Sequence, residues 1–330
     1  MTRRTIYATT LALTILTACG ESGPASEGET VRGVSDTEIR IGTHTDLSGP
    51  VAATGAGSVN GQRMRYAEVN EKGGVHGRKI VLIAEDTQYQ LPLAVKAGNK
   101  LLNMDKIFAM AGALGTPHNV ALMPKQFEVG VPNMFPFTGA PQMYEPFHPL
   151  KFGLIVSYTA QMHAGIRELV KQFGVSKLCL QALANDYGAE VQAGYDSIVE
   201  EMGLSSVYVG RHKPTESDFV GTVTSIKNSG CELLALGPLV KDTILIYSAL
   251  RSAGWQGPVV STWASTADEV TNSGVTDGLY ALSQFGIPDY EAELKKGGEL
   301  ADWYTAYTKR FGHTPSVQAQ MGYVIADLTT

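Results

Sequence analysis

The sequence has few cysteines, no basic stripe and only a short hydrophobic run at its N-terminus. Three of its 330 residues are cysteine, and 32 acidic residues against 26 basic ones give a net charge of −6. Without a concentrated basic surface, a nucleic acid is not an expected partner. The apolar run at 6–16 is far shorter than the roughly 20 residues that a membrane-spanning helix needs.

Motifs of catalysis are missing as well. The sequence contains no Gly-x-Ser-x-Gly, His-Glu-x-x-His or Cys-x-x-Cys, and its histidines are scattered. The glycine-rich segment 55–61 is similar to a dinucleotide fingerprint, but its third glycine stands one place late and a further loop separates it from the preceding strand. We therefore expect a protein that is not an enzyme and that uses no cofactor or metal.

What is present is a globular composition. Hydrophobic residues make up 44% and charged residues 18%, which excludes a disordered chain, and the length suits two domains. The 36 glycines follow no collagen-like period, so they indicate many tight turns between short elements.

The N-terminus has the features of a secretory signal. Arg3 and Arg4 precede the short apolar run, which predicts a signal peptide over 1–18. The small residues before Cys19 resemble a bacterial lipobox, at which the cysteine is lipidated and becomes the mature N-terminus. An ordinary cleavage site beside a chance cysteine is the alternative. Lipidated Cys19 would anchor the protein to a membrane surface.

Two other segments lack a clear place in a compact fold. Residues 19–35 are rich in Gly, Ser, Glu and Pro and predict a flexible tether. The helical pattern 317–328 ends without a stop signal, which favours a chain lacking its C-terminal closing segment over a frayed last element.

The two remaining cysteines, Cys179 and Cys231, lie in or beside apolar runs. Buried, inert thiols are the default expectation. An oxidising compartment permits a disulfide between them, but their spacing does not indicate one.

From residue 38 onward, short β-branched runs alternate with longer helical periods, which is typical of parallel sheets with crossover helices. The pattern predicts strands at 39–43, 79–84, 107–111, 131–135, 177–182, 206–210, 233–236, 259–262 and 278–284. It predicts helices at 58–71, 93–103, 117–128, 160–173, 189–202, 218–228, 242–253 and 291–311. Two such series predict two doubly wound lobes, with the ligand at the carboxyl ends of the strands.

One helix start suggests an anion site. Thr116 and Pro117 follow a predicted strand and suit the N-cap and first position of a helix. A carboxylate could bind the backbone N–H groups near Gly115 and Thr116 together with the Thr116 hydroxyl. The alternative is a self-contained cap that contacts only its own helix.

Several segments together resemble the periplasmic leucine/isoleucine/valine-type binding proteins, the substrate-binding subunits of ABC importers. The resemblance covers roughly residues 36–325. It rests on the segments Glu38-Ile39-Arg40-Ile41-Gly42, Leu47-Ser48-Gly49-Pro50, Gly73-Gly74-Val75-His76-Gly77, Gly115-Thr116-Pro117, Asn185-Asp186-Tyr187-Gly188 and Arg251-Ser252-Ala253-Gly254-Trp255.

This resemblance implies a type I periplasmic binding protein fold, an α/β architecture of two Rossmann-like lobes joined by hinge strands. We expect lobe 1 to comprise 36–155 and 282–330, and lobe 2 to comprise 156–281. The implied protein is an extracytoplasmic monomer that closes on a small solute and delivers it to an ABC permease and its ATPase subunits. The alternative is a sensory receptor that passes closure to a signalling partner.

The resemblance also implies the ligand site. The loop with Gly115 and Thr116 corresponds to the part that holds the ligand's carboxylate, and Tyr187 to an aromatic ring over the solute, with a surface tyrosine as the alternative. The full set of expected ligand-binding residues is Ser48, Thr54, Leu114, Gly115, Thr116, Phe137, Thr138, Tyr187, Leu239 and Trp263.

The sequence departs from the family where relatives pair an acidic residue with the ligand's ammonium, because Trp263 stands there. A buried ammonium without a carboxylate is costly. We therefore expect an organic acid, aromatic or aliphatic, ahead of a branched-chain amino acid. Asp186, Glu190 and Asp268 remain candidates for a replacement acid.

Overall fold

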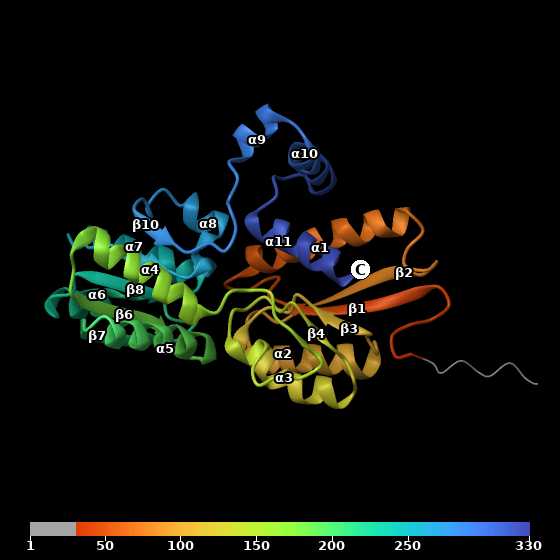
Figure 1. Cartoon of the computed structure of the whole chain (residues 1–330), viewed down its shortest axis with the longest axis horizontal. Helices are drawn as coiled ribbons and strands as arrows, with labels where there is room; N and C mark the ends of the chain where they lie inside the picture. The colour runs from red at the N-terminus through yellow and green to blue at the C-terminus, as the bar shows by residue number, and fades with distance from the viewer. Residues whose placement is uncertain (1–30) are drawn as a thin grey trace, which may run out of the picture. The chain divides into compact units, whose positions relative to one another are not determined.

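The computed structural model describes residues 31–330. The predicted signal peptide, Cys19 and most of the predicted tether therefore lie outside the described residues. The described chain forms two five-stranded parallel sheets with helices packed on them, and this confirms the predicted fold class (Figure 1).

The first sheet has the strand order β2-β1-β3-β4-β5, and all its strands are parallel. Its strands are β1 (Glu38–Thr45), β2 (Lys79–Asp86), β3 (Ala109–Ala111), β4 (Asn133–Met134) and β5 (Lys151–Phe152). β1 is an interior strand, since Ile41 pairs with Leu82 on one side and with Ala109 on the other. The pattern of the sequence did not predict the short β5.

The second sheet has the order β10-β9-β8-β6-β7 and is also parallel. Its strands are β6 (Lys177–Leu183), β7 (Ser205–His212), β8 (Leu233–Gly237), β9 (Val259–Ser261) and β10 (Leu279–Ala281). When each sheet's strands are numbered by their own order in the chain, both sheets read 2-1-3-4-5 from one edge. In such a sheet the strand order reverses between the first and third strands, and the ligand crevice lies outside the carboxyl ends of these two strands.

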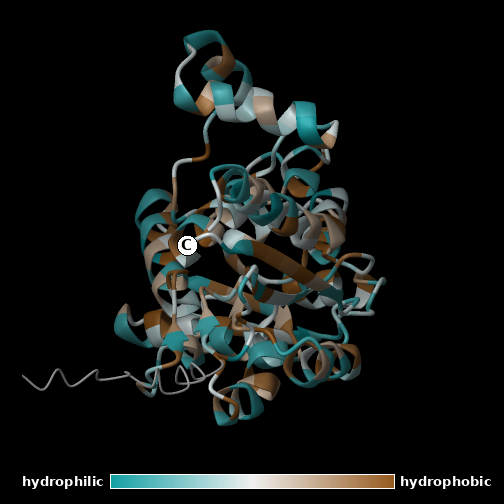
Figure 2. Ribbon diagram, turned by 90° about the vertical axis from the view of Figure 1, so that its right-hand side faces the viewer, coloured by the Kyte–Doolittle hydropathy of each residue, from teal (hydrophilic) through white to brown (hydrophobic). Residues whose placement is uncertain are grey.

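Helices cover the sheets because their apolar sides and the buried strands share one core. They are α1 (Ala52–Glu71), α2 (Leu91–Asn99), α3 (Thr116–Glu128), α4 (Tyr158–Phe173), α5 (Asp186–Glu201), α6 (Val220–Asn228), α7 (Val240–Ser252), α8 (Asp268–Thr271), α9 (Tyr290–Lys296), α10 (Glu299–Phe311) and α11 (Val317–Thr329). Figure 2 shows the most hydrophobic residues along the strands, with hydrophilic residues on the covering helices. Every helix of the described chain is too short or too polar to cross a lipid bilayer.

The first helix begins earlier than predicted. α1 starts at Ala52, not near residue 58, so the glycine-rich segment lies inside a helix. Glycine lowers helix propensity, which is why the pattern placed the start too late. The glycines are needed for packing, because a Cβ at Gly61 would overlap the carbonyl oxygen of Ala319 in α11, and a Cβ at Gly322 would overlap that of Ser58.

The predicted helix over 291–311 is two helices. α9 ends and α10 begins around Gly297 and Gly298, whose φ angles are 72° and 96°. Consecutive residues in this left-handed region cannot continue an α-helix. The periodicity on both sides was correct, but the break was missed.

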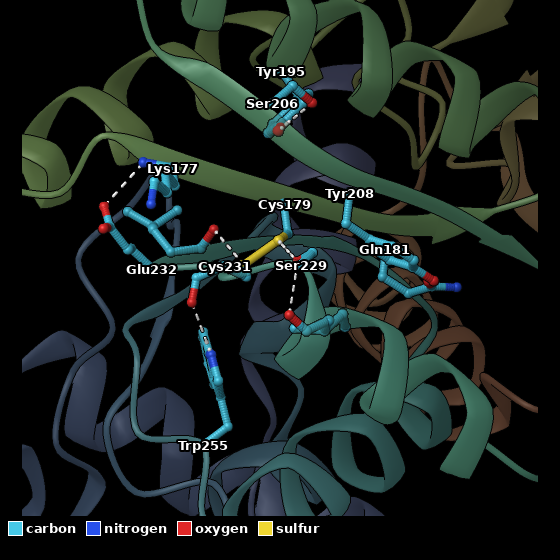
Figure 3. The surroundings of a disulfide bond; sticks show 12 residues. Lys177, Cys179, Gln181, Tyr195, Ser206, Tyr208, Ser229, Cys231, Glu232 and Trp255 are labelled. Atoms are coloured by element: carbon cyan, nitrogen blue, oxygen red, sulfur yellow. Dashed lines mark hydrogen bonds between the residues drawn. A yellow bond between two sulfur atoms is a disulfide. The ribbon is translucent and has the colours of Figure 1, made fainter.

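The expectation of two free thiols is wrong. Cys179 in β6 and Cys231, just before β8, form a disulfide with their Cα atoms 5.8 Å apart (Figure 3). β6 and β8 are hydrogen-bonded neighbours, so residues 52 positions apart in the chain become adjacent. The Trp255 indole donates a 3.0 Å hydrogen bond to the Cys231 carbonyl beside the bridge.

Candidate functional site

A small cavity lies where the carboxyl ends of strands from both sheets meet. Its volume is about 60 Å³. One buried water occupies roughly 10–15 Å³ by this measure, so the cavity has room for about four to six water-sized groups. Its lining residues are Val51, Thr54, Tyr89, Leu114, Gly115, Thr116, Phe137, Tyr158, Tyr187, Leu239, Val240, Trp263, Ala264 and Gln318.

The lining is built largely from helix N-termini. Val51, Gly115 and Leu239 are the N-cap residues of α1, α3 and α7. Tyr158 and Tyr187 lie in the first turns of α4 and α5. The starts of α4 and α5 are capped by Ser157 and Asn185, and Asp242 accepts from the Leu239 N–H at the start of α7. The start of α3 has no side-chain cap, so its partial positive charge favours an anion in this volume.

The structure brings eight of the ten predicted ligand-binding residues to this cavity. They are Thr54, Leu114, Gly115, Thr116, Phe137, Tyr187, Leu239 and Trp263.

The other two lie elsewhere. Ser48 is exposed in the loop after β1, and its hydroxyl donates a 2.5 Å hydrogen bond to Asp86. Thr138 is buried behind the lining, where its hydroxyl contacts those of Thr116 and Tyr158. Thr138 is thus placed to orient the lining hydroxyls of Thr116 and Tyr158. The Ser48 hydroxyl contacts Asp86 and no residue of the cavity lining.

The start of α3 differs from the prediction in one respect. The N-cap is Gly115, with a φ of 101°, and Thr116 is the first helical residue. No side chain caps this helix, and the Thr116 hydroxyl shares a 2.6 Å hydrogen bond with Thr138 Oγ1. The alternative of a self-contained threonine cap is therefore wrong, and the uncapped helix start faces the cavity.

Neutral polar groups converge on the cavity. The Thr116, Thr138 and Tyr158 hydroxyls form a chain, with 3.3 Å between Thr138 Oγ1 and the Tyr158 oxygen. Trp263 is 6% exposed, and its Nε1–H faces the Tyr158 hydroxyl but makes no well-formed hydrogen bond to any of residues 31–330. A buried donor without a partner is destabilising, so this N–H is available for an acceptor on a ligand.

Aromatic rings from both lobes close the cavity. The Phe137 and Trp263 ring centroids are 4.9 Å apart, and those of Tyr158 and Tyr187 are 4.8 Å apart. Tyr187 is 4% exposed and its hydroxyl shares a 2.7 Å hydrogen bond with Thr262. The surface-tyrosine alternative is therefore wrong.

Burial keeps the phenols of the cavity protonated. It raises the pKa of Tyr89, Tyr158 and Tyr187 above the ordinary value, so each hydroxyl stays a neutral hydrogen-bond donor at physiological pH. Nearby, burial and then the proximity of His118 lower the pKa of His44 to about 3. Burial also lowers the pKa of His118. These histidines are neutral at pH 7.

No charged side chain lines the cavity of the described chain. The two fully buried carboxylates have other partners. Asp46 accepts backbone hydrogen bonds from Ser48, Gly49 and Val51. Asp242 Oδ2 lies 3.2 Å from His212 Nε2 and accepts from the Leu239 N–H, while Asp242 Oδ1 has no partner among residues 31–330.

The three candidates for a replacement acid also lie outside the lining. Asp186, Glu190 and Asp268 are not among the lining residues, and Glu190 accepts a 2.6 Å hydrogen bond from Gln142. An ammonium in this cavity would therefore find no carboxylate among the residues that line it.

Sequence reasoning missed six lining residues, of which Tyr89 and Tyr158 matter most. Both follow a strand in the chain, Tyr89 after β2 and Tyr158 after β5 at the start of α4. A polar residue shortly after a parallel strand is the signal that would have found Tyr89, whereas the strand before Tyr158 was not predicted. The others are Val51, Val240, Ala264 and Gln318.

Residues 31–330 contain no group of three or more His, Cys, Asp or Glu side chains that could hold a metal ion. The arrangement offers neutral donors, an uncapped helix start and aromatic walls around a small volume. It can hold a small acidic molecule between two lobes by hydrogen bonds and packing.

Two α/β lobes with parallel sheets of the order 2-1-3-4-5, and a cavity at the carboxyl ends of both sheets, are the architecture of a solute-binding protein. The chain belongs to the periplasmic binding protein family, whose sequence profile matches residues 38–330. The resemblance seen in the sequence is thus confirmed. Membership of this family implies an extracytoplasmic protein that binds a solute and is not an enzyme.

Known relatives are distant in sequence and similar in fold. The Leu/Ile/Val-binding protein homolog 7 of Brucella suis is 22% identical over 92% of this chain and 76% of its own length. A fatty acid ABC transporter substrate-binding protein from Thermomonospora curvata has a TM-score of 0.80 at 22% identity, over 91% of this chain and 76% of that one. An ABC transporter solute-binding protein from R. palustris in complex with benzoate has a TM-score of 0.77 at 17% identity, over 88% and 79%.

Proposed function

We propose that this protein is the solute receptor of an ABC importer. It captures a small carboxylate-bearing molecule by closure of its lobes and presents the closed form to a membrane permease. The names of its relatives support the transporter role, since they include Leu/Ile/Val-binding and ABC transporter substrate-binding proteins. Contacts to both lobes favour the closed state, because a ligand shifts a conformational equilibrium by its differential affinity.

The ligand class follows from the charges of the cavity. The uncapped start of α3, the Trp263 N–H and neutral hydroxyls suit a carboxylate, while an ammonium would be buried without a counter-charge among the lining residues. We therefore propose an organic acid ahead of a branched-chain amino acid. A fatty acid ABC transporter substrate-binding protein and a solute-binding protein in complex with benzoate share this fold, which supports a ligand without an amino group.

Two ligands that differ only in the α-ammonium test this preference. In calorimetric titrations, 3-methylbutanoate is expected to bind at least about a hundredfold more tightly than valine, because breaking or omitting one partner of a buried charge pair costs several kcal/mol. The neutral 3-methylbutanamide is the control for the carboxylate and is expected to bind more weakly than the acid. Valine or leucine binding more tightly than the acid would overturn the preference, and benzoate tests an aromatic acid.

We also propose that Cys19 carries the lipid anchor that holds the receptor to the membrane. The short apolar run followed by small residues and a cysteine supports this. Mass spectrometry of the mature protein is expected to show an N-terminal peptide that begins at Cys19 and carries a diacylglycerol. An unmodified N-terminus beyond Cys19 contradicts the proposal.

A further inference from the structure

A second, larger space adjoins the cavity. This groove has a volume of about 460 Å³, compared with about 60 Å³ for the cavity by the same measure. It runs between the first turns of α1, from the first lobe, and α7, from the second.

Three residues line both spaces. Val51 and Thr54 at the start of α1, together with Val240 at the start of α7, belong to the cavity lining and to the groove lining. The two spaces therefore adjoin at these three residues. A solute too long for the cavity would therefore continue past them into the groove.

The groove is chemically different from the cavity. Its inner wall is aliphatic, with Ala52, Ile244 and Leu245 beside the two shared valines, and Ala53 lies exposed at its rim. Its two charged residues, Lys241 and Glu269, are exposed and so belong to its rim. The polar donors of the site, by contrast, lie in the cavity.

The small volume of the cavity and the apolar lining of the groove together indicate which ligand would fill both spaces. The cavity holds about four to six water-sized groups, which a carboxylate and a few carbons fill. The aliphatic groove begins where the cavity ends. Binding of a hydrocarbon chain against it is favourable, because apolar surface of both the chain and the groove is removed from water.

We propose that the groove is a second subsite of the same binding site and holds the hydrocarbon chain of a monocarboxylic acid longer than about four carbons. The carboxylate lies in the cavity and the chain passes Val51 and Val240. This inference rests on the proposed function and narrows its ligand class to acids with an extended aliphatic chain.

Titration with a series of straight-chain acids tests it. For the wild-type protein, the affinity is expected to rise about two- to fourfold with each methylene from butanoate through hexanoate to octanoate, the factor depending on how fully each methylene is buried. Over the four added methylenes the gain amounts to between about 15-fold and about 250-fold.

Ala53→Trp is expected to obstruct the groove and to leave the cavity unchanged. Ala53 is exposed and lines only the groove, so the substitution is expected to leave the fold and butanoate binding intact while hexanoate and octanoate lose their gain. The matched control is Ala306→Trp, at an exposed alanine of α10 that lines neither space, and it should keep the full chain-length dependence.

Three results would count against the proposal in different ways. If butanoate binds and longer acids bind no better to the wild-type protein, the groove subsite is wrong while the proposed function stands. If Ala53→Trp retains the full gain, the chain does not occupy the groove. If no carboxylate of the series binds, the proposed ligand class fails and this inference fails with it. If the tryptophan variant is unstable, the dependence of wild-type affinity on acid chain length tests the groove subsite by itself.

Discussion

Replacing Cys179 and Cys231 by alanine is expected to lower the free energy of unfolding by about 4 kcal/mol. The bridge joins residues 52 positions apart, and a cross-link over a loop of that length restricts the unfolded chain strongly. Both cysteines are buried and lie in the core of the second lobe, so the alanine variant also loses some packing.

Guanidinium unfolding of the oxidised wild-type protein and of the double variant measures this loss. The wild-type protein in strong reductant is the control, since it loses the cross-link and keeps the side chains. The affinity for the acid is expected to be unchanged, because the bridge lies toward the amino ends of β6 and β8 while the cavity is at the carboxyl ends. A loss below about 1 kcal/mol in both experiments would mean that the bridge contributes little.

Replacing Trp263 by phenylalanine is expected to weaken acid binding by about 10- to 150-fold, because a hydrogen bond to a charged group contributes about 1.5–3 kcal/mol. The substitution removes the Nε1–H, which makes no well-formed hydrogen bond to the described residues, and keeps a ring to pack on Phe137. Calorimetric titration with 3-methylbutanoate measures the change.

Trp303→Phe is the matched control. The Trp303 Nε1–H also has no partner within residues 31–330, but Trp303 lies in α10 and does not line the cavity. This variant should bind the acid as the wild-type protein does. An equal loss in both variants would indicate a general effect on the fold, and no loss in Trp263→Phe would show that the indole N–H does not contact the solute.

The local pattern of the sequence predicted most elements because their causes are local. Alternation of β-branched runs and helical periods placed β1, β2, β6 and β8 close to their observed bounds. The misplaced start of α1 has a tertiary cause, since its glycines lower helix propensity yet allow α11 to approach. The same holds for the disulfide, which depends on β6 and β8 becoming neighbours.

For the site, residues with a motif were easier to predict than those without one. Thr116 and Tyr187 follow strands within recognisable segments, and both line the cavity. Tyr158 follows the two-residue strand β5, which has no periodicity to detect. Thr138 shows the reverse case, because its position behind Thr116 is decided by packing and not by its place after a strand.

The sequence by itself determined that two parallel α/β lobes form and that a helix begins directly after β3, at Thr116 and Pro117. These depend on residue type and spacing along the chain, which the sequence contains directly. Only the tertiary structure decided which side chains enclose one small volume, that Cys179 meets Cys231, and that an aliphatic groove continues from the cavity between α1 and α7. Each of these depends on distances between segments far apart in the chain, and packing of the whole fold sets such distances.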